Sequence, residues 1–191
     1  MVMGGYVLRD NRLGFSTGNT IPDTTGTITL KTSGFHPIFS GIPLDGQTGN
    51  MFNDYATIVT HTAYGTNVTA RGISAVTDAL AGKPTVLATV GTASDPTFGA
   101  PVIALWNIGD TLNPDDRTEV LGGYRMMFLS GSREPNGVTG GEVAGVMDLT
   151  ADGKKLFLNT VNYFITVVPE PSSLVLLMLG GGVLFARRWR V

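Results

Sequence analysis

The sequence predicts an α/β protein in which a mostly parallel sheet is flanked by helices and one short transmembrane helix closes the chain. Three segments, 85–90, 102–106 and 125–129, are almost continuously apolar. Strands that are covered on both faces have this pattern, and such strands are typical of parallel sheets between helices. Near the end of the chain, residues 172–186 carry no charge and are followed at once by arginines.

The strands are expected where runs rich in β-branched residues lie between glycines or prolines. In chain order these runs are 26–30, 55–60, 85–90, 102–106 and 124–129.

A helix is expected to begin after Thr150, whose hydroxyl can cap it, with Asp152 placed favourably against the helix dipole. Apolar residues then recur at i, i+4, i+7, i+8 and i+11 and form one stripe. This stripe is expected to pack on the sheet as core; its members are Phe157, Val161, Phe164, Ile165 and Val168.

The C-terminal tail, residues 166–191, begins with a rigid polar break. Pro169 and Pro171 flank Glu170, and each proline fixes its own φ and biases the preceding residue away from helix. The segment is therefore expected to be extended.

A membrane helix over 172–186 and a basic end at 187–190 follow the break. The apolar core of this helix has 13 residues, 174–186, fewer than the roughly 20 that usually cross a bilayer. The span is therefore expected to be thin, with its arginines reaching the lipid interface. Arg187, Arg188 and Arg190 are predicted to remain in the cytoplasm as the membrane stop.

Tripeptide, apolar stretch and basic end, in this order, resemble the PEP-CTERM sorting domain of Gram-negative bacteria. The resemblance implies export, retention in the inner membrane with the body on the periplasmic side, and cleavage by an exosortase, a membrane transpeptidase. The processed protein would then reach the cell surface or the medium. The implied partners are membrane lipid, the exosortase and, because such bacteria make it, exopolysaccharide.

Composition narrows the chemistry of the body. Cysteine is absent, so disulfides, thiolate metal sites and a cysteine nucleophile are excluded. The net charge is −2; without the three tail arginines and Glu170, residues 1–168 have 10 basic and 14 acidic side chains, or −4. A mildly acidic body argues against nucleic acid as a partner. The 26 glycines and 10 prolines favour a loop-rich domain.

Several stretches of the body resemble the C-terminal half of a class I glutamine amidotransferase-like domain, the flavodoxin-like fold shared with ThuA-type proteins. They are 2–6, 34–41, the strand pair 85–90 and 102–106, and 149–162. The resemblance implies an amidotransferase-like α/β domain over 1–165 whose first parallel strands are missing. An incomplete N-terminus would also explain why no signal peptide is visible.

The catalytic set of that family is not carried over. Its nucleophile would lie near Gly4 and Gly5, where there is neither Cys nor Ser, and its His–Glu pair would lie in 130–135, which has no histidine. We therefore predict no catalytic residue and no cofactor.

Other motifs favour ordinary structure over chemistry. The segment 14–18 matches the Gly-x-Ser-x-Gly elbow of serine hydrolases, but polar residues precede it and Pro22 follows, so a glycine-rich turn is expected. His36 and His61 are the only histidines. With Asp54 or Asp45 they could form a base pair or metal site only through tertiary structure, and His36 before a proline fits a loop or helix start.

Two further loops have oxygen-rich sequences. Residues 110–116 concentrate ligands that calcium prefers, but they lack the glycine and distal glutamate of an EF-hand, so a solvated turn is expected. Residues 67–69 match a glycosylation sequon. No metal site is predicted.

Three functional interpretations remain. The first is a non-catalytic, exported and membrane-anchored envelope or matrix protein that is sorted by its tail. The second is a hydrolase or carbohydrate-active ThuA-like enzyme with catalytic residues upstream of Met1. The third is a plain single-pass membrane protein whose Pro-Glu-Pro is only a hinge.

Overall fold

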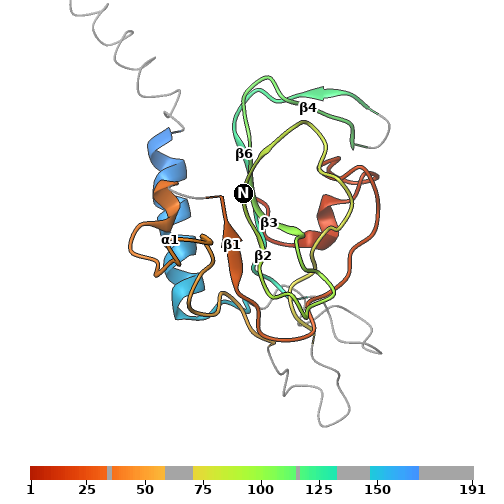
Figure 1. Cartoon of the computed structure of the whole chain (residues 1–191). Helices are drawn as coiled ribbons and strands as arrows, with labels where there is room; N and C mark the ends of the chain where they lie inside the picture. The colour runs from red at the N-terminus through yellow and green to blue at the C-terminus, as the bar shows by residue number, and fades with distance from the viewer. Residues whose placement is uncertain (34–35, 59–70, 115–116, 133–146, 168–191) are drawn as a thin grey trace, which may run out of the picture.

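A computed structural model describes residues 1–33, 36–58, 71–114, 117–132 and 147–167 (Figure 1). Its centre is a four-stranded sheet with the order β1-β2-β3-β6. The strands are β1 Leu30–Thr32, β2 Thr85–Val90, β3 Pro101–Trp106 and β6 Arg125–Phe128.

Smaller elements surround this sheet. A second, two-stranded sheet pairs β4 Thr111–Leu112 with β5 Glu119–Val120. Two short 3-10 helices are η1 Gly5–Leu8 and η2 Pro37–Phe39, and the α-helix α1 covers Ala151–Val167.

The predicted parallel, flavodoxin-like sheet is wrong, because all three strand pairs of the central sheet are antiparallel. The connection between β2 and β3, residues 91–100, contains turns and no helix. A parallel pair needs a crossover of about a dozen residues or more, usually with a helix, so this short connection returns the chain antiparallel. One parallel contact exists beside β6, where the Val2 N–H donates to the Met126 carbonyl at 2.8 Å.

Three of the predicted strands are confirmed at nearly their predicted bounds, as β2, β3 and β6. The first strand lies slightly later than predicted, as β1, with an isolated bridge at Ile28 before it. The predicted strand at 55–60 is reduced to bridges at Ala56 within the described residues.

Both faces of the sheet are buried, as the apolar strands predicted, but helices do not cover both. Ile103 pairs with Phe128, and the Phe128 ring packs against Phe157 of α1 with centroids 5.4 Å apart. Trp106 is three residues from Ile103 and therefore points to the opposite face. There its ring meets Phe15, which belongs to an irregular segment, at 4.6 Å. Figure 1 shows α1 on one side of the sheet, and on the other mostly irregular chain with the short helix η1.

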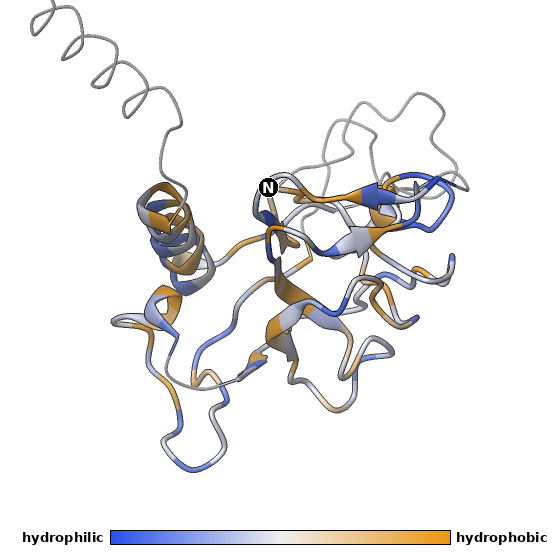
Figure 2. Ribbon diagram, turned by 90° about the horizontal axis from the view of Figure 1, so that it is seen from above, coloured by the Kyte–Doolittle hydropathy of each residue, from blue (hydrophilic) through white to orange (hydrophobic). Residues whose placement is uncertain are grey.

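Helix α1 begins as predicted. The Thr150 hydroxyl accepts a hydrogen bond from the Gly153 N–H at 3.2 Å and donates to the Tyr55 carbonyl at 3.1 Å. The predicted stripe is only partly correct, because Leu156 and Thr160 form the fully buried face while Ile165 is 68% exposed. Figure 2 shows hydrophobic and hydrophilic residues mixed around α1.

The predicted transmembrane helix is not borne out. Within the residues that the structure describes, no helix combines the length and the apolar character needed to cross a bilayer. The segment 172–186 itself, like Val168 of the helical stripe, lies outside the described residues.

Candidate functional site

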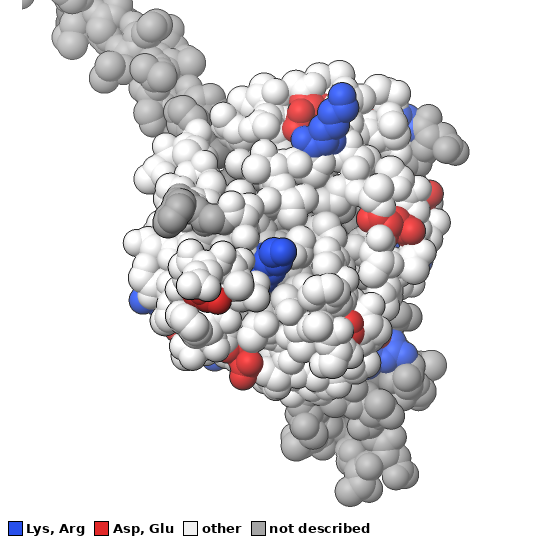
Figure 3. All heavy atoms as spheres, in the orientation of Figure 1, with Lys and Arg blue, Asp and Glu red and all other residues white. Residues whose placement is uncertain are grey.

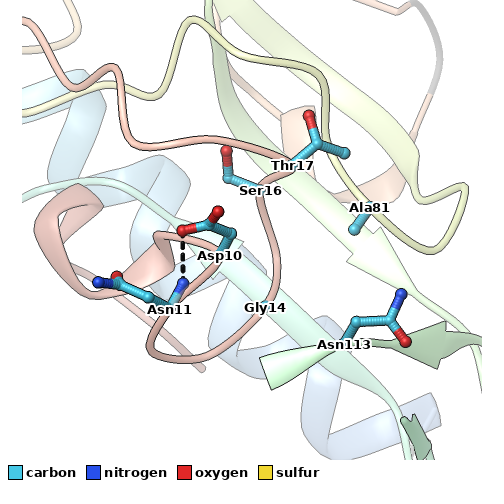
Figure 4. Close-up of a pocket in the computed structure, with 7 residues that line it drawn as sticks. All are labelled: Asp10, Asn11, Gly14, Ser16, Thr17, Ala81 and Asn113. Carbon is cyan, nitrogen blue, oxygen red and sulfur yellow. Dashed lines mark hydrogen bonds between the residues drawn. The ribbon is translucent and has the colours of Figure 1, made fainter. Parts of the chain in front are cut away.

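A polar pocket of about 460 Å³ lies beside the second face of the sheet (Figure 4). Three segments that are distant in sequence form it: the loop 10–17, the irregular stretch near residue 81 with its single bridge at Leu80, and the chain after β4. Its lining residues are Asp10, Asn11, Gly14, Ser16, Thr17, Ala81 and Asn113.

Backbone hydrogen bonds hold two of these segments together. The Ala81 N–H donates to the Phe15 carbonyl at 2.9 Å, and the Thr17 N–H donates to the Ala79 carbonyl at 2.9 Å. The Ala81 carbonyl in turn accepts from the Trp106 indole N–H at 2.7 Å. Because Trp106 is fully buried in β3, this wall of the pocket is anchored to the central sheet.

Gly14 brings the third segment into place. Its φ is +66°, a conformation that residues with a side chain rarely adopt. A Cβ at this position would lie 2.5 Å from the Pro114 nitrogen. Only glycine therefore lets the turn of residues 10–14 contact the backbone of Asn113 and Pro114 closely.

The polar side chains differ in whether they already have partners. The Ser16 hydroxyl is engaged with the Gly18 backbone, and the Thr17 hydroxyl donates to the Ala79 carbonyl at 3.0 Å. One Asp10 carboxylate oxygen accepts from the Asn11 N–H at 2.5 Å. Among the described residues, the other Asp10 oxygen and the Asn113 amide have no hydrogen-bond partner, so they are available to a ligand.

The segment 14–18 is the glycine-rich turn that the sequence predicted. Ser16 pairs with Leu80 in a single bridge and its hydroxyl closes a local turn with Gly18. The described lining of the pocket contains no histidine that could act as a base. The serine-hydrolase interpretation therefore gains no support here.

His36 lies at the start of η2, as expected. Its Nδ1 accepts a hydrogen bond from the Ile38 N–H at 3.5 Å, and its ring packs edge-on against Tyr163 of α1 at 4.6 Å. Burial lowers the pKa of His36. His61 lies outside the described residues.

The candidate aspartates lie apart from one another, and Asp45 and Asp110 have local hydrogen-bond partners. Asp45 accepts from the Thr48 hydroxyl and the Gln47 N–H, which lower its pKa. Asp54 lines a separate pocket of about 370 Å³ at the start of α1. Asp110 accepts from the Asn107 N–H at 2.7 Å.

The structure adds no support for the oxygen-rich loop 110–116 as a metal site or for the glycosylation sequon. The described part of the chain contains no group of three or more His, Cys, Asp or Glu residues that could hold a metal ion. Residues 67–69 and 115–116 lie outside it. The sorting residues Pro169, Glu170, Pro171, Arg187, Arg188 and Arg190 lie outside it as well.

Sequence reasoning missed a buried polar pair. Asp148 and Ser130 lie opposite each other, because the Asp148 N–H donates to the Ser130 carbonyl at 3.0 Å. They are 1% and 0% exposed, and neither side chain has a hydrogen-bond partner among the described residues. Burial raises the pKa of Asp148 to about 7. No sequence motif marks this pair, because only the fold places residues 130 and 148 side by side.

Comparison with known proteins concerns the tail. A family model for the PEP-CTERM protein-sorting motif matches residues 167–191. The chain carries this sorting motif. The match confirms the predicted recognition of the tail, implies an exosortase as the processing partner, and marks the protein for secretion-related sorting to the cell envelope or surface.

The body has no comparable match. No curated protein matches the chain, and no solved structure matches it. The predicted likeness of residues 1–165 to a glutamine amidotransferase or ThuA-like domain is therefore unsupported, and the antiparallel sheet contradicts its fold.

Proposed function

We propose that this protein is an exosortase substrate whose body is delivered to the cell envelope and acts there as a non-catalytic matrix component. The sorting motif at 167–191 carries the proposal. Helix α1 ends at Val167, and Pro169, Glu170 and Pro171 follow in the sequence after Val168. The prolines favour an extended chain, which is the form a processing enzyme needs to bind.

The described body suits an interaction role. Its polar pocket has free hydrogen-bonding groups at Asp10 and Asn113, while its serine is held in a local turn. Exopolysaccharide is the partner that we propose for the delivered protein, since an envelope protein with a polar pocket can bind hydroxyl-rich chains.

A reporter fusion tests the sorting role. Residues 167–191 are fused to a secreted reporter in a host that contains an exosortase. We expect the reporter to lose the end of the tail and to reach the surface or the medium. Replacing Pro169, Glu170 and Pro171 together by alanine should abolish processing, whereas the matched change of Ser172 and Ser173 to alanine should not. If the variant with alanine at 169–171 is processed as well as the variant with alanine at 172 and 173, the proposal is contradicted.

The basic end gives a second test of sorting. If Arg187, Arg188 and Arg190 act together with the motif, changing all three to glutamine should strongly reduce the processed fraction, because the matched sorting motif includes this basic end. Western blotting of cell and medium fractions measures this fraction. Unchanged processing would show that the tripeptide acts without the arginines.

A further inference from the structure

We propose that the exosortase which processes the tail also docks on the folded body, on the outer face of α1 formed by Leu158, Asn162 and Ile165. This inference rests on the proposed function for the identity of the enzyme. It goes further, because it assigns part of the recognition to a surface of the body.

The outer face of α1 is apolar where the solvent side of a helix is usually charged. Leu158, Asn162 and Ile165 recur at i, i+4 and i+7 and therefore share one face. Leu158 is 61% exposed and Ile165 is 68% exposed. Residues 156–167 include no charged side chain, and Figure 3 shows an uncharged surface over the C-terminal half of α1 on the side in view. Such a face suits an apolar partner surface.

Contacts with η2 hold this face outward. The Asn159 amide nitrogen donates to the Ile38 carbonyl at 2.9 Å and to the Ser40 carbonyl at 2.8 Å. The Tyr163 ring packs edge-on against His36 with centroids 4.6 Å apart. These contacts fix the rotation of α1 about its own axis, so the outer face is already in place before a partner binds and little freedom is lost on docking.

A shallow pocket lies beside the outer face, along the same half of the helix. Its volume is about 250 Å³, and its lining is mostly apolar. A hollow of this kind next to exposed apolar side chains can receive an apolar side chain of a partner. The lining residues are Pro37, Asn159, Asn162, Tyr163 and Thr166.

The position of the outer face along the chain identifies its partner. The match to the sorting motif begins at Val167, which is also the last residue of α1. Pro169 lies two residues further on, so covalent geometry keeps it within about 7 Å of Val167. An enzyme that binds the chain at Pro169 therefore meets the end of α1. From Ile165 the outer face runs back to Leu158 over about 10 Å of helix, so the two contacts are continuous.

A lipid surface is the main competitor for the outer face, because apolar helix faces also enter the membrane interface. Helices that lie in this interface are rich in Lys and Arg beside their apolar face. Residues 156–167 have neither. The enzyme is therefore the favoured partner, and lipid vesicles are included as a probe.

The rate of tail processing tests the docking. The full-length protein is followed over time in a host with an exosortase. Leu158→Gln together with Ile165→Gln removes both apolar side chains and keeps uncharged residues that favour helix. We expect the initial rate to fall about tenfold or more, as when apolar contacts at the centre of an interface are lost.

A matched control changes apolar residues of similar exposure elsewhere. Ile108 is 59% exposed and Val120 is 65% exposed, and both lie at the β4–β5 sheet, which Figure 1 places away from α1. The double variant Ile108→Gln and Val120→Gln should be processed like the parent. Urea unfolding of all variants compares their stability.

Cross-linking tests contact directly and does not depend on the glutamine variants. A photo-reactive phenylalanine derivative replaces Asn162 in one protein and Val120 in another, and both are expressed with an epitope-tagged exosortase. We expect an adduct that carries the tag from position 162 and none from position 120.

Three results would overturn the inference. The first is equal processing of the α1 double variant and its control. The second is an adduct formed equally from both positions or from neither. The third is binding of the processed protein to vesicles of phosphatidylethanolamine and phosphatidylglycerol that the α1 double variant loses while its processing is unchanged, which would assign the outer face to lipid.

The reporter that carries only residues 167–191 separates this inference from the proposed function. If the reporter is processed and the α1 double variant behaves like its control, only the docking on α1 is wrong. If neither the reporter nor the full-length parent is processed, the proposed function itself fails.

Discussion

At the scale of single residues, Asp148 makes stability depend on pH. Its carboxyl is buried without a partner, and burial raises its pKa from 3.8 to about 7. The folded protein therefore keeps a proton that the unfolded chain loses between about pH 4 and 7. The free energy of unfolding should fall as pH rises through this window and then level off.

Asp148→Asn tests this directly. A neutral amide removes the cost of a buried charge, so the variant should be more stable than the parent at pH 8, by up to about 4 kcal/mol from the pKa difference. At pH 4 the two should differ little. Urea denaturation at both pH values measures the difference, and an equal effect at both would contradict the assignment.

The contribution of Asp95 to stability depends on pH in the opposite direction. Burial by itself would raise its pKa, but hydrogen bonds from Thr97 and Thr25 to its two oxygens lower the pKa overall. Its stabilising effect is present above the unfolded value of 3.8 and is lost as pH falls through the lower folded value.

Asp95→Asn replaces one acceptor oxygen by a donor that faces other donors. We expect it to lower the free energy of unfolding at pH 7 by about 1–3 kcal/mol. The loss should shrink as pH falls below 3.8, because the parent then gives up part of the stability that its charged carboxylate contributes. Thermal unfolding at pH 7 and pH 3 measures the loss of stability at each pH. A loss that does not depend on pH would refute the role of the charge.

At the scale of elements, the close contact of α1 with the segment at Tyr55 reverses the effect on stability that a glycine-to-alanine change in a helix would ordinarily have. Alanine favours helix over glycine by about 1 kcal/mol. At Gly153, however, a Cβ would lie only 2.1 Å from the Tyr55 carbonyl oxygen. Gly153→Ala should therefore destabilise the protein, by about 1–3 kcal/mol as overpacking does. An exposed control, Asn162→Ala, should be neutral or slightly stabilising by denaturant unfolding.

The strands and the helix show how much of the fold the sequence could predict. Apolar runs located β2, β3 and β6 and predicted that both their faces are buried, because burial leaves its pattern in the side chains. Strand direction depends on the connections, and the short segment 91–100 was the available signal. The buried face of α1 shifted from the predicted stripe to Leu156 and Thr160, because close approach at Gly153 sets the orientation of the helix.

At the scale of the whole molecule, the tail and the body differ in how much their sequences reveal. The sorting motif is contiguous, so Pro169, Glu170 and Pro171 could be recognised without a structure. The pocket joins residues near 10–17, 81 and 113, and the buried pair joins 130 and 148. Such sites depend on long-range contacts that no local pattern encodes.

The sorting role is the central claim, and the mass of the mature C-terminus tests it most directly. The full-length protein is purified from a host with an exosortase and from the same host without that enzyme. We predict that the first protein lacks Arg187, Arg188 and Arg190 because cleavage occurs near Pro169–Pro171, and that the second retains them. A C-terminus ending at Val191 in both hosts would contradict the account.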